Sequence, residues 1–230
     1  MKKLTKIGSV LMASAMLISA AGCNLFGGSK IGPAALASFA DNEGSERYDD
    51  ADDFIDLIQD LNDNESSIKK LKNGVHATLE GKDLKTFFKN SLIGGTGYTS
   101  FSYDKTMTQA TVYYIGGQKN DKKWAFSALS IQFEDAEAAE EYYDDSVDSI
   151  ETGFDMLTRY MDGDTDDGEE GGIAYFIAEA SNSSSGVYEG IYRDGNTVLF
   201  IISADINGKD GSKTLDSFCE TFTIISPKDI

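Results

Sequence analysis

A strand-like pair followed by a long amphipathic helix constrains the fold of this chain more than any other feature. Residues 110–115 and 124–133 are rich in aromatic and β-branched side chains, and two glycines and an Asn-Asp pair separate them. Asp135 then offers a helix N-cap, and apolar residues recur at steps of three and four over 136–161. The order predicts a β-hairpin that leads directly into a helix.

The second half of the chain repeats this order. Strand signals occupy 173–180, 187–193 and 196–204, and Asp194-Gly195 between the last two favours a tight antiparallel hairpin. Ser212 can then cap a helix with a single apolar stripe made of Leu215, Phe218, Cys219 and Phe222. Residues 108–161 and 173–222 therefore share one plan, without convincing identity between their residues.

These patterns predict an α+β fold, in which an antiparallel sheet carries helices packed on one face and is built from two strand-strand-helix halves. Ahead of the first half, apolar stripes predict shorter helices that begin at Pro33 and span 49–61 and 83–92. A further strand is predicted at 99–103. We expect residues 33–230 to form one domain, because 230 residues leave little room for two.

An acidic, glycine-rich segment at 162–172 separates the two halves, and we expect it to be a loop. Its alternate carboxylates, which could converge on one hard cation, are Asp162, Asp164 and Asp166. An EF-hand is disfavoured, because Asp167 stands where the sharp turn needs glycine and Ile173 where a bidentate glutamate is required. Loose calcium association and a solvated connector both remain open.

The composition excludes several classes of function. The net charge of −19 repels phosphate backbones, which argues against nucleic-acid binding. One histidine and two cysteines are too few for cysteine-rich zinc sites or a disulfide framework. A Ser-His-Asp triad would have to use His76, which has no carboxylate near it in sequence, so we expect a packing or surface role. Cys219 lies on an apolar stripe, where we expect a buried thiol.

The N-terminus has the order of a secretory signal peptide over residues 1–22. Three lysines precede an apolar run that is short for a membrane span, and small residues follow it. The segment ends Ala20-Ala21-Gly22-Cys23, which resembles the lipobox of bacterial lipoproteins, although Ala20 replaces the usual leucine. The resemblance implies that Cys23 is lipidated and becomes the new N-terminus, and residues 23–32 would then form a flexible tether.

Lipidation would place the domain on the extracytoplasmic side of the cell membrane. Two or more acyl chains hold a protein durably at a bilayer. Removal of residues 1–22 removes three lysines and no acids, which takes the net charge from −19 to −22. A surface of anionic lipid repels such a domain, so we expect the lipid alone to hold it at the membrane.

The whole layout resembles small lipoproteins of Gram-positive gut-type bacteria. The resemblance rests on the lipobox, Tyr48-Asp49-Asp50, the segment 133–139 and the segment 192–198. It implies an α+β extracytoplasmic domain, and no catalytic residue can be carried over from it.

We therefore expect a noncatalytic binding or sensing module of the cell envelope, without a cofactor. Its partners, besides the membrane, would be a small ligand, a glycan or an envelope protein. The alternative is an enzyme that acts on envelope material through acidic residues. Several tyrosines could line a groove, although their spacing favours the core and its rim: Tyr113, Tyr114, Tyr142, Tyr143, Tyr175, Tyr188 and Tyr192.

Overall fold

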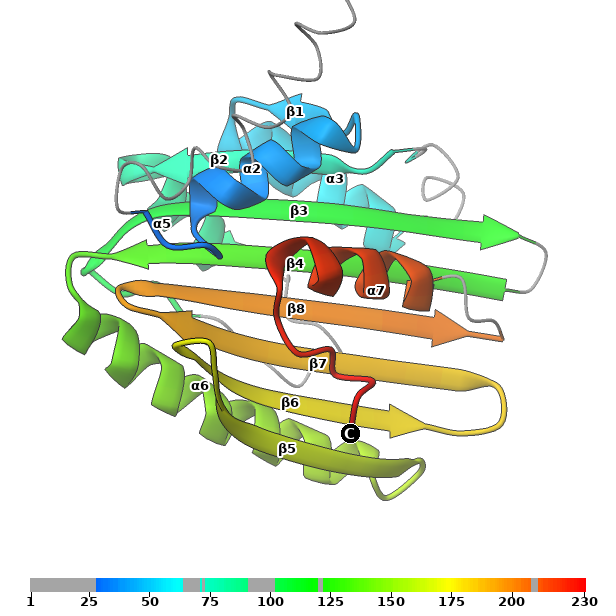
Figure 1. Cartoon of the computed structure of the whole chain (residues 1–230). Helices are drawn as coiled ribbons and strands as arrows, with labels where there is room; N and C mark the ends of the chain where they lie inside the picture. The colour runs from blue at the N-terminus through cyan, green and yellow to red at the C-terminus, as the bar shows by residue number, and fades with distance from the viewer. Residues whose placement is uncertain (1–27, 64–70, 72, 91–101, 120–121, 208–210) are drawn as a thin grey trace, which may run out of the picture.

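A single twisted sheet forms the centre of the molecule (Figure 1). The computed structural model describes residues 28–63, 71, 73–90, 102–119, 122–207 and 211–230. Within these residues the sheet has eight strands in the order β1-β2-β3-β4-β8-β7-β6-β5. β1 pairs with β2 in parallel, and every other neighbouring pair is antiparallel. The predicted α+β class is confirmed.

The elements follow the chain in an order close to the predicted one. The helices are α2 (Pro33–Asn42), α3 (Ala51–Asp63), α5 (Gly81–Asn90), α6 (Ala136–Leu157) and α7 (Gly211–Phe222). The strands are β1 (Glu46–Tyr48), β2 (Val75–Glu80), β3 (Met107–Lys119), β4 (Lys122–Phe133), β5 (Asp162–Glu170), β6 (Ile173–Ser181), β7 (Ser185–Asp194) and β8 (Thr197–Ile206).

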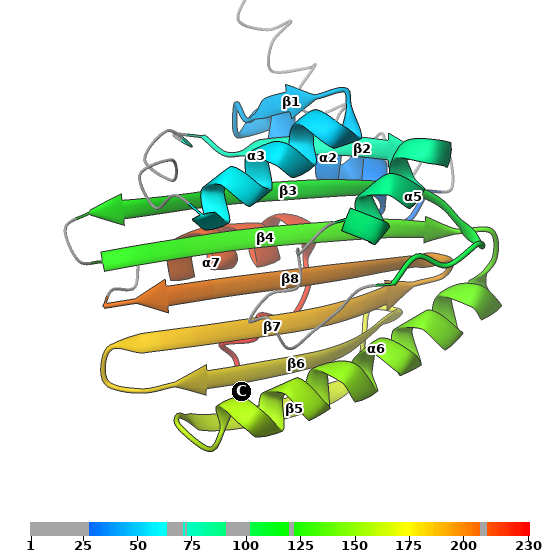
Figure 2. The same ribbon diagram turned by 180° about the vertical axis from the view of Figure 1, so that it is seen from behind.

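The prediction that all helices pack on one face is wrong, because they cover both. α2 and α7 lie on one face, and α3, α5 and α6 lie on the other (Figures 1 and 2). Alternation along the central strands shows the cause. On β4, Phe126 and Ala128 enter the core under α2 and α7, whereas Leu129 and Ile131 enter the core on the opposite face. A strand that is apolar on both sides needs cover on both.

The repeated plan is present, but the two halves are not copies. Each half contains a hairpin followed by a helix: β3 and β4 precede α6, and β7 and β8 precede α7. β4 and β8 pair with each other at the middle of the sheet. Because α6 and α7 lie on opposite faces, no rotation that brings one hairpin onto the other also superposes the helices.

The segment predicted as an acidic loop is a strand. β5 pairs with β6 over its whole length, from Asp162 opposite Ser181 to Glu170 opposite Ile173, and Gly171-Gly172 makes the turn between them. All nine residues of β5 are exposed, because the strand lies at the edge of the sheet. Polar composition predicts a loop, whereas here the backbone pairs with its neighbour and the acids face water on both sides.

Two short strands at the other edge were not predicted. β2 alternates well enough to have been found from Val75 to Leu79, and its side chains are almost all buried. β1 has only three residues, and it pairs in parallel with β2 after the turn that follows α2. The strand predicted at 99–103 lies mostly outside the described residues.

The first described residues are fastened to the turn between β7 and β8. The Ser29 hydroxyl and the Lys30 backbone N–H both donate to the Asp194 carboxylate, at 2.8 and 3.0 Å. The buried Ser130 hydroxyl donates to the Ile31 carbonyl at 2.6 Å. The predicted signal peptide and Cys23 lie outside the described residues. Within the described residues, no helix is both long and apolar enough to cross a bilayer.

Candidate functional site

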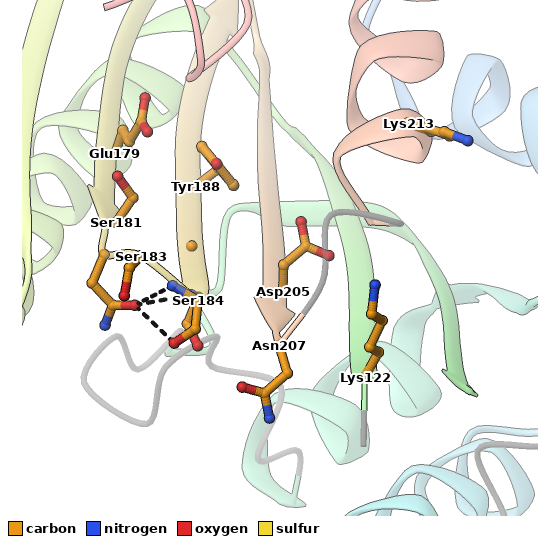
Figure 3. Close-up of a pocket in the computed structure, with 12 residues that line it drawn as sticks. Lys122, Glu179, Ser181, Ser183, Ser184, Tyr188, Asp205, Asn207 and Lys213 are labelled. Carbon is orange, nitrogen blue, oxygen red and sulfur yellow. Dashed lines mark hydrogen bonds between the residues drawn. The ribbon is translucent and has the colours of Figure 1, made fainter. Parts of the chain in front are cut away.

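A polar pocket opens at the end of the sheet where β6 turns into β7. Its volume is about 570 Å³, and it lies on the face that carries α7 (Figure 3). We call it the strand-end pocket, and it is lined by Lys122, Glu179, Ser181, Asn182, Ser183, Ser184, Ser185, Gly186, Tyr188, Asp205, Asn207 and Lys213. Its walls come from β4, β6, β7, β8 and the first turn of α7.

Two rows of cross-strand partners form the floor of the pocket. In the first row, Gly186 lies between Asp205 on β8 and Ser181 on β6. In the second row, Tyr188 pairs with Glu179 on β6. Directly paired residues share a face of the sheet, so the register alone brings these side chains together from three strands.

Gly186 provides the space for the ring of Tyr188. A Cβ at Gly186 would lie 2.8 Å from the Tyr188 hydroxyl oxygen and 2.9 Å from a ring carbon. The ring is therefore laid over the glycine and becomes part of the pocket floor. Burial raises the pKa of the Tyr188 hydroxyl, and the negative charges of Glu179 and Asp205 raise it further. Tyr188 is a neutral hydrogen-bonding group at physiological pH.

The charges in the pocket are separated by sign. Asp205 is only 2% exposed, and Glu179 is half-buried. Lys122 and Lys213 are exposed and lie on the other side of Asp205, on β4 and α7 (Figure 3). The arrangement can bind a small polar molecule that carries hydrogen-bonding groups or charges of both signs.

The β6–β7 turn that closes the pocket is held by one side chain. The Asn182 carboxamide oxygen accepts hydrogen bonds from the backbone N–H groups of Ser184 and Ser185, each at 2.9 Å, and from the Ser184 hydroxyl at 3.2 Å. An asparagine that bonds the backbone two and three residues ahead stabilises a turn. The pocket therefore has a fixed rim.

The structure does not bring the three candidate calcium ligands together. Asp162, Asp164 and Asp166 share one face of β5, but successive side chains on the same face of a strand are about 7 Å apart. Calcium needs oxygens at about 2.3–2.6 Å from one point. Asp166 accepts a hydrogen bond from the Tyr175 hydroxyl at 3.1 Å. No group of three or more potential ligands gathers anywhere in the described part of the chain.

The fold does bring a serine and a carboxylate to His76. The Ser45 hydroxyl oxygen lies 2.5 Å from Nδ1 of His76, and the Asp41 carboxylate lies 3.4 Å from Nε2. Sequence analysis missed this cluster, because more than thirty residues separate Ser45 from His76. Its composition is that of a catalytic triad, so its surroundings decide its role.

Those surroundings favour a structural role. The backbone N–H groups of Gly44, Ser45 and Glu46 already donate to carbonyls at 3.0 Å, so they cannot stabilise an oxyanion. The His76 ring is 1% exposed, so it is shielded from substrate, and Asp41 is largely in water. The cluster ties the turn after α2 to β2.

The His76 cluster predicts a pH dependence of stability. Burial lowers the pKa of His76, against the opposing effect of Asp41. The stabilisation that depends on neutral His76 is therefore complete above its ordinary pKa and is lost as the pH falls below it. His76→Gln should lower the free energy of unfolding by about 1–3 kcal/mol at pH 7.5.

Urea unfolding of both proteins between pH 7.5 and pH 5 measures this difference. We expect the difference in free energy of unfolding between wild type and His76→Gln to become smaller as the pH falls. The nearby charges of Asp41, Asp49 and Arg47 are present in both proteins, so the comparison isolates the effect of His76. A gap that stays constant would show that His76 does not titrate with unfolding.

Cys219 is buried at 4% exposure, as predicted. Burial raises its pKa to about 12, and the nearby Asp216 and Asp229 act in the same direction. A thiol with such a pKa is a poor nucleophile at neutral pH. Cys219 therefore serves to pack α7 against the sheet.

The tyrosines lie in the core or at its rim, as their spacing indicates. Tyr113 and Tyr192 are fully buried, Tyr143 and Tyr188 nearly so, and Tyr114, Tyr142 and Tyr175 pack against the two cores. Among them, Tyr188 lines the strand-end pocket. The sequence signal for it is the repeat Gly186-Val-Tyr188-Glu-Gly190-Ile-Tyr192, in which each tyrosine ring lies over the glycine two residues earlier.

A second hollow, of about 480 Å³, lies between α6 and the β5–β6 pair. Its carboxylates are those of Asp144, Asp148, Glu151 and Asp167, and all four are exposed. A general acid that keeps its proton near neutral pH needs a dry environment. This acidic groove lacks that environment, so it gives no support to acid catalysis.

Comparisons with known proteins provide no family. No protein-family model matches the chain, and no curated protein matches it. Among solved structures, it is similar to the extracellular domain of PknH from Mycobacterium tuberculosis, with 9% identity and a TM-score of 0.30. The match covers 51% of this chain and 66% of that one. Similarity of this degree says nothing about function.

Proposed function

We propose that this protein is a lipid-anchored, extracytoplasmic binding module that takes up a small polar ligand in the strand-end pocket without transforming it. The observation that carries the proposal is the pocket itself. A floor assembled from three strands, a nearly fully buried carboxylate at Asp205 and a turn fixed by Asn182 make a preformed site.

The position of the tether supports this function. Ser29 and Lys30 fasten the start of the domain to Asp194, in the β7–β8 turn. The pocket lies at the opposite end of the same strands, by the β6–β7 turn (Figure 1). The nine residues from Gly186 to Asp194 are eight steps along the strand, which span about 27 Å. An anchor at Cys23 would therefore hold the pocket away from the bilayer, open to the surrounding solution.

The anchor is tested by palmitate labelling of cells that express the wild type or Cys23→Ala. We expect label on the wild type and none on the variant, because the thiol of Cys23 is the attachment point implied by the lipobox. Cys219→Ala, which removes the other cysteine, serves as the control and should keep the label. Equal labelling of wild type and Cys23→Ala would refute the anchor.

Ligand binding is tested by thermal shift across panels of short peptides, oligosaccharides and divalent cations. A ligand that prefers the native state raises the melting temperature. Ser181→Trp places an indole beside Gly186 and should abolish the shift. Ser217→Trp, on the exposed side of α7, should keep it. If no compound in the panels raises the melting temperature of the wild type, or if both variants show the same shift with a ligand, the pocket is not the binding site.

A further inference from the structure

Negative and positive side chains lie at opposite ends of the strand-end pocket, along the direction that crosses the strands of the sheet. From β6 to β4, its charged side chains are Glu179, then Asp205, then Lys122. Lys213 lies on the same side as Lys122, on α7 (Figure 3). A ligand lying across the strands therefore meets carboxylates under one end and ammonium groups at the other.

The carboxylate end suits an organic cation. Glu179 pairs with Tyr188, Asp205 pairs with Gly186, and the Tyr188 ring lies over Gly186. An ammonium group here can contact a carboxylate and the Tyr188 side chain together. A divalent metal ion is disfavoured, because the backbones of β6 and β8 are about 10 Å apart and two carboxylates so separated cannot readily close around one ion.

The lysine end suits a carboxylate. Lys213 is in the first turn of α7, and that turn carries no acidic residue. The N-terminus of a helix bears partial positive charge, which adds to the charges of Lys122 and Lys213. A neutral sugar would use neither end fully, because it brings no charge to offset either group.

The separation between the two ends limits the length of the ligand. The backbones of β4 and β6 are about 14 Å apart, since three strand spacings separate them. In Figure 3 the Lys213 ammonium group points away from Asp205, so this exposed side chain must turn to meet a ligand, and the two charge centres are then closer together than the backbones of β4 and β6. The ends of an extended dipeptide are about 7 Å apart.

From this geometry we propose that the strand-end pocket binds a short peptide with free ends, its ammonium group beside Asp205 and Glu179 and its carboxylate beside Lys122 and Lys213. The proposal rests on the proposed function, because it names the ligand class for that pocket. A dipeptide fills part of the pocket and leaves the open side for its side chains.

Three probes test the charge pattern by calorimetry: alanyl-alanine, N-acetyl-alanyl-alanine and alanyl-alanine amide. The second lacks the ammonium group and the third lacks the carboxylate. We expect the free dipeptide to bind at least tenfold more tightly than either blocked form, because each block removes a charge-assisted contact. Equal affinity for all three would overturn the proposal.

Two variants assign the ends. Glu179→Gln should reduce the preference for a free ammonium group, and Lys213→Gln should reduce the preference for a free carboxylate. Their controls are Glu169→Gln on β5 and Lys82→Gln on α5, which are exposed and outside the pocket. If the control variants lose the preference for free peptide ends as much as the pocket variants do, the peptide binds elsewhere and the proposal is overturned.

A neutral trisaccharide distinguishes failure of this proposal from failure of the proposed function. If the trisaccharide binds the wild type, Ser181→Trp abolishes that binding and alanyl-alanine does not bind, the pocket is a binding site for another class and the peptide proposal is overturned. If neither probe binds and no compound in the thermal-shift panels raises the melting temperature, both the peptide proposal and the proposed function are overturned.

Discussion

Phe218→Ala should lower the free energy of unfolding by about 3–5 kcal/mol, which is a large share of the stability of an ordinary domain. The Phe218 ring is fully buried on α7. Its centroid lies 5.1 Å from that of Phe39 on α2, 5.0 Å from that of Phe126 on β4 and 4.4 Å from that of Phe222. Its removal leaves a cavity where two helices meet the sheet.

Urea unfolding followed by circular dichroism measures the effect. Phe218→Leu keeps most of the volume and should lose less than half as much stability. Tyr160→Ala removes an aromatic ring that is 84% exposed, and we expect a change below about 0.5 kcal/mol. A loss below about 1 kcal/mol for Phe218→Ala would show that the core between α2 and α7 is loosely packed.

Gly74→Ala should destabilise the protein by about 2–4 kcal/mol, through two effects at one position. Gly74 precedes β2 at φ +85°, a left-handed conformation that alanine adopts only with strain. In addition, a Cβ there would lie 2.8 Å from the backbone oxygen of Tyr114 and 2.8 Å from the Tyr113 ring. The Tyr114 oxygen belongs to β3 and cannot move without disturbing the sheet.

Gly172→Ala separates the two effects. Gly172 has φ +84°, almost the same as Gly74, but a Cβ there would meet nothing within 4 Å. Its loss of stability should be about 1–2 kcal/mol, which is the conformational strain alone. The difference between the two variants then measures the steric clash. Equal losses would mean that the β3 backbone accommodates the added methyl group.

Local signals predicted much of the fold. Asp135 caps α6 as expected, since its carboxylate accepts a hydrogen bond from the Ala138 backbone N–H at 2.9 Å. Asp194-Gly195 makes the turn between β7 and β8, with Gly195 at φ +59°. Both are properties of a few neighbouring residues. For the same reason, the apolar stripes at 136–161 and 212–222 predicted α6 and α7 well.

Properties that depend on the whole sheet were not predictable in this way. The choice between one and two covered faces depends on whether Phe126 and Leu129, on opposite sides of β4, are both buried, and a run of mixed apolar residues leaves that open. β5 is a strand only because β6 offers it an edge. Its composition predicts a loop.

The strand-end pocket could not be found from the sequence for a similar reason. Glu179, Tyr188 and Asp205 meet because of the register of three strands, and a shift by one residue would send each side chain to the other face. The contacts of His76 with Asp41 and Ser45 likewise follow from the placement of β2 next to β1.

The acidic edge strand has a consequence for how these molecules behave when crowded. One border of the sheet ends in β1, which is only three residues long, and the other ends in β5, with nine exposed residues of which six are acidic. An open border is a template on which another chain can add and fibres can grow. The acidic β5 edges of two copies repel each other. Copies gathered at high density would therefore stay separate, although no helix or loop covers this edge in the described part of the chain.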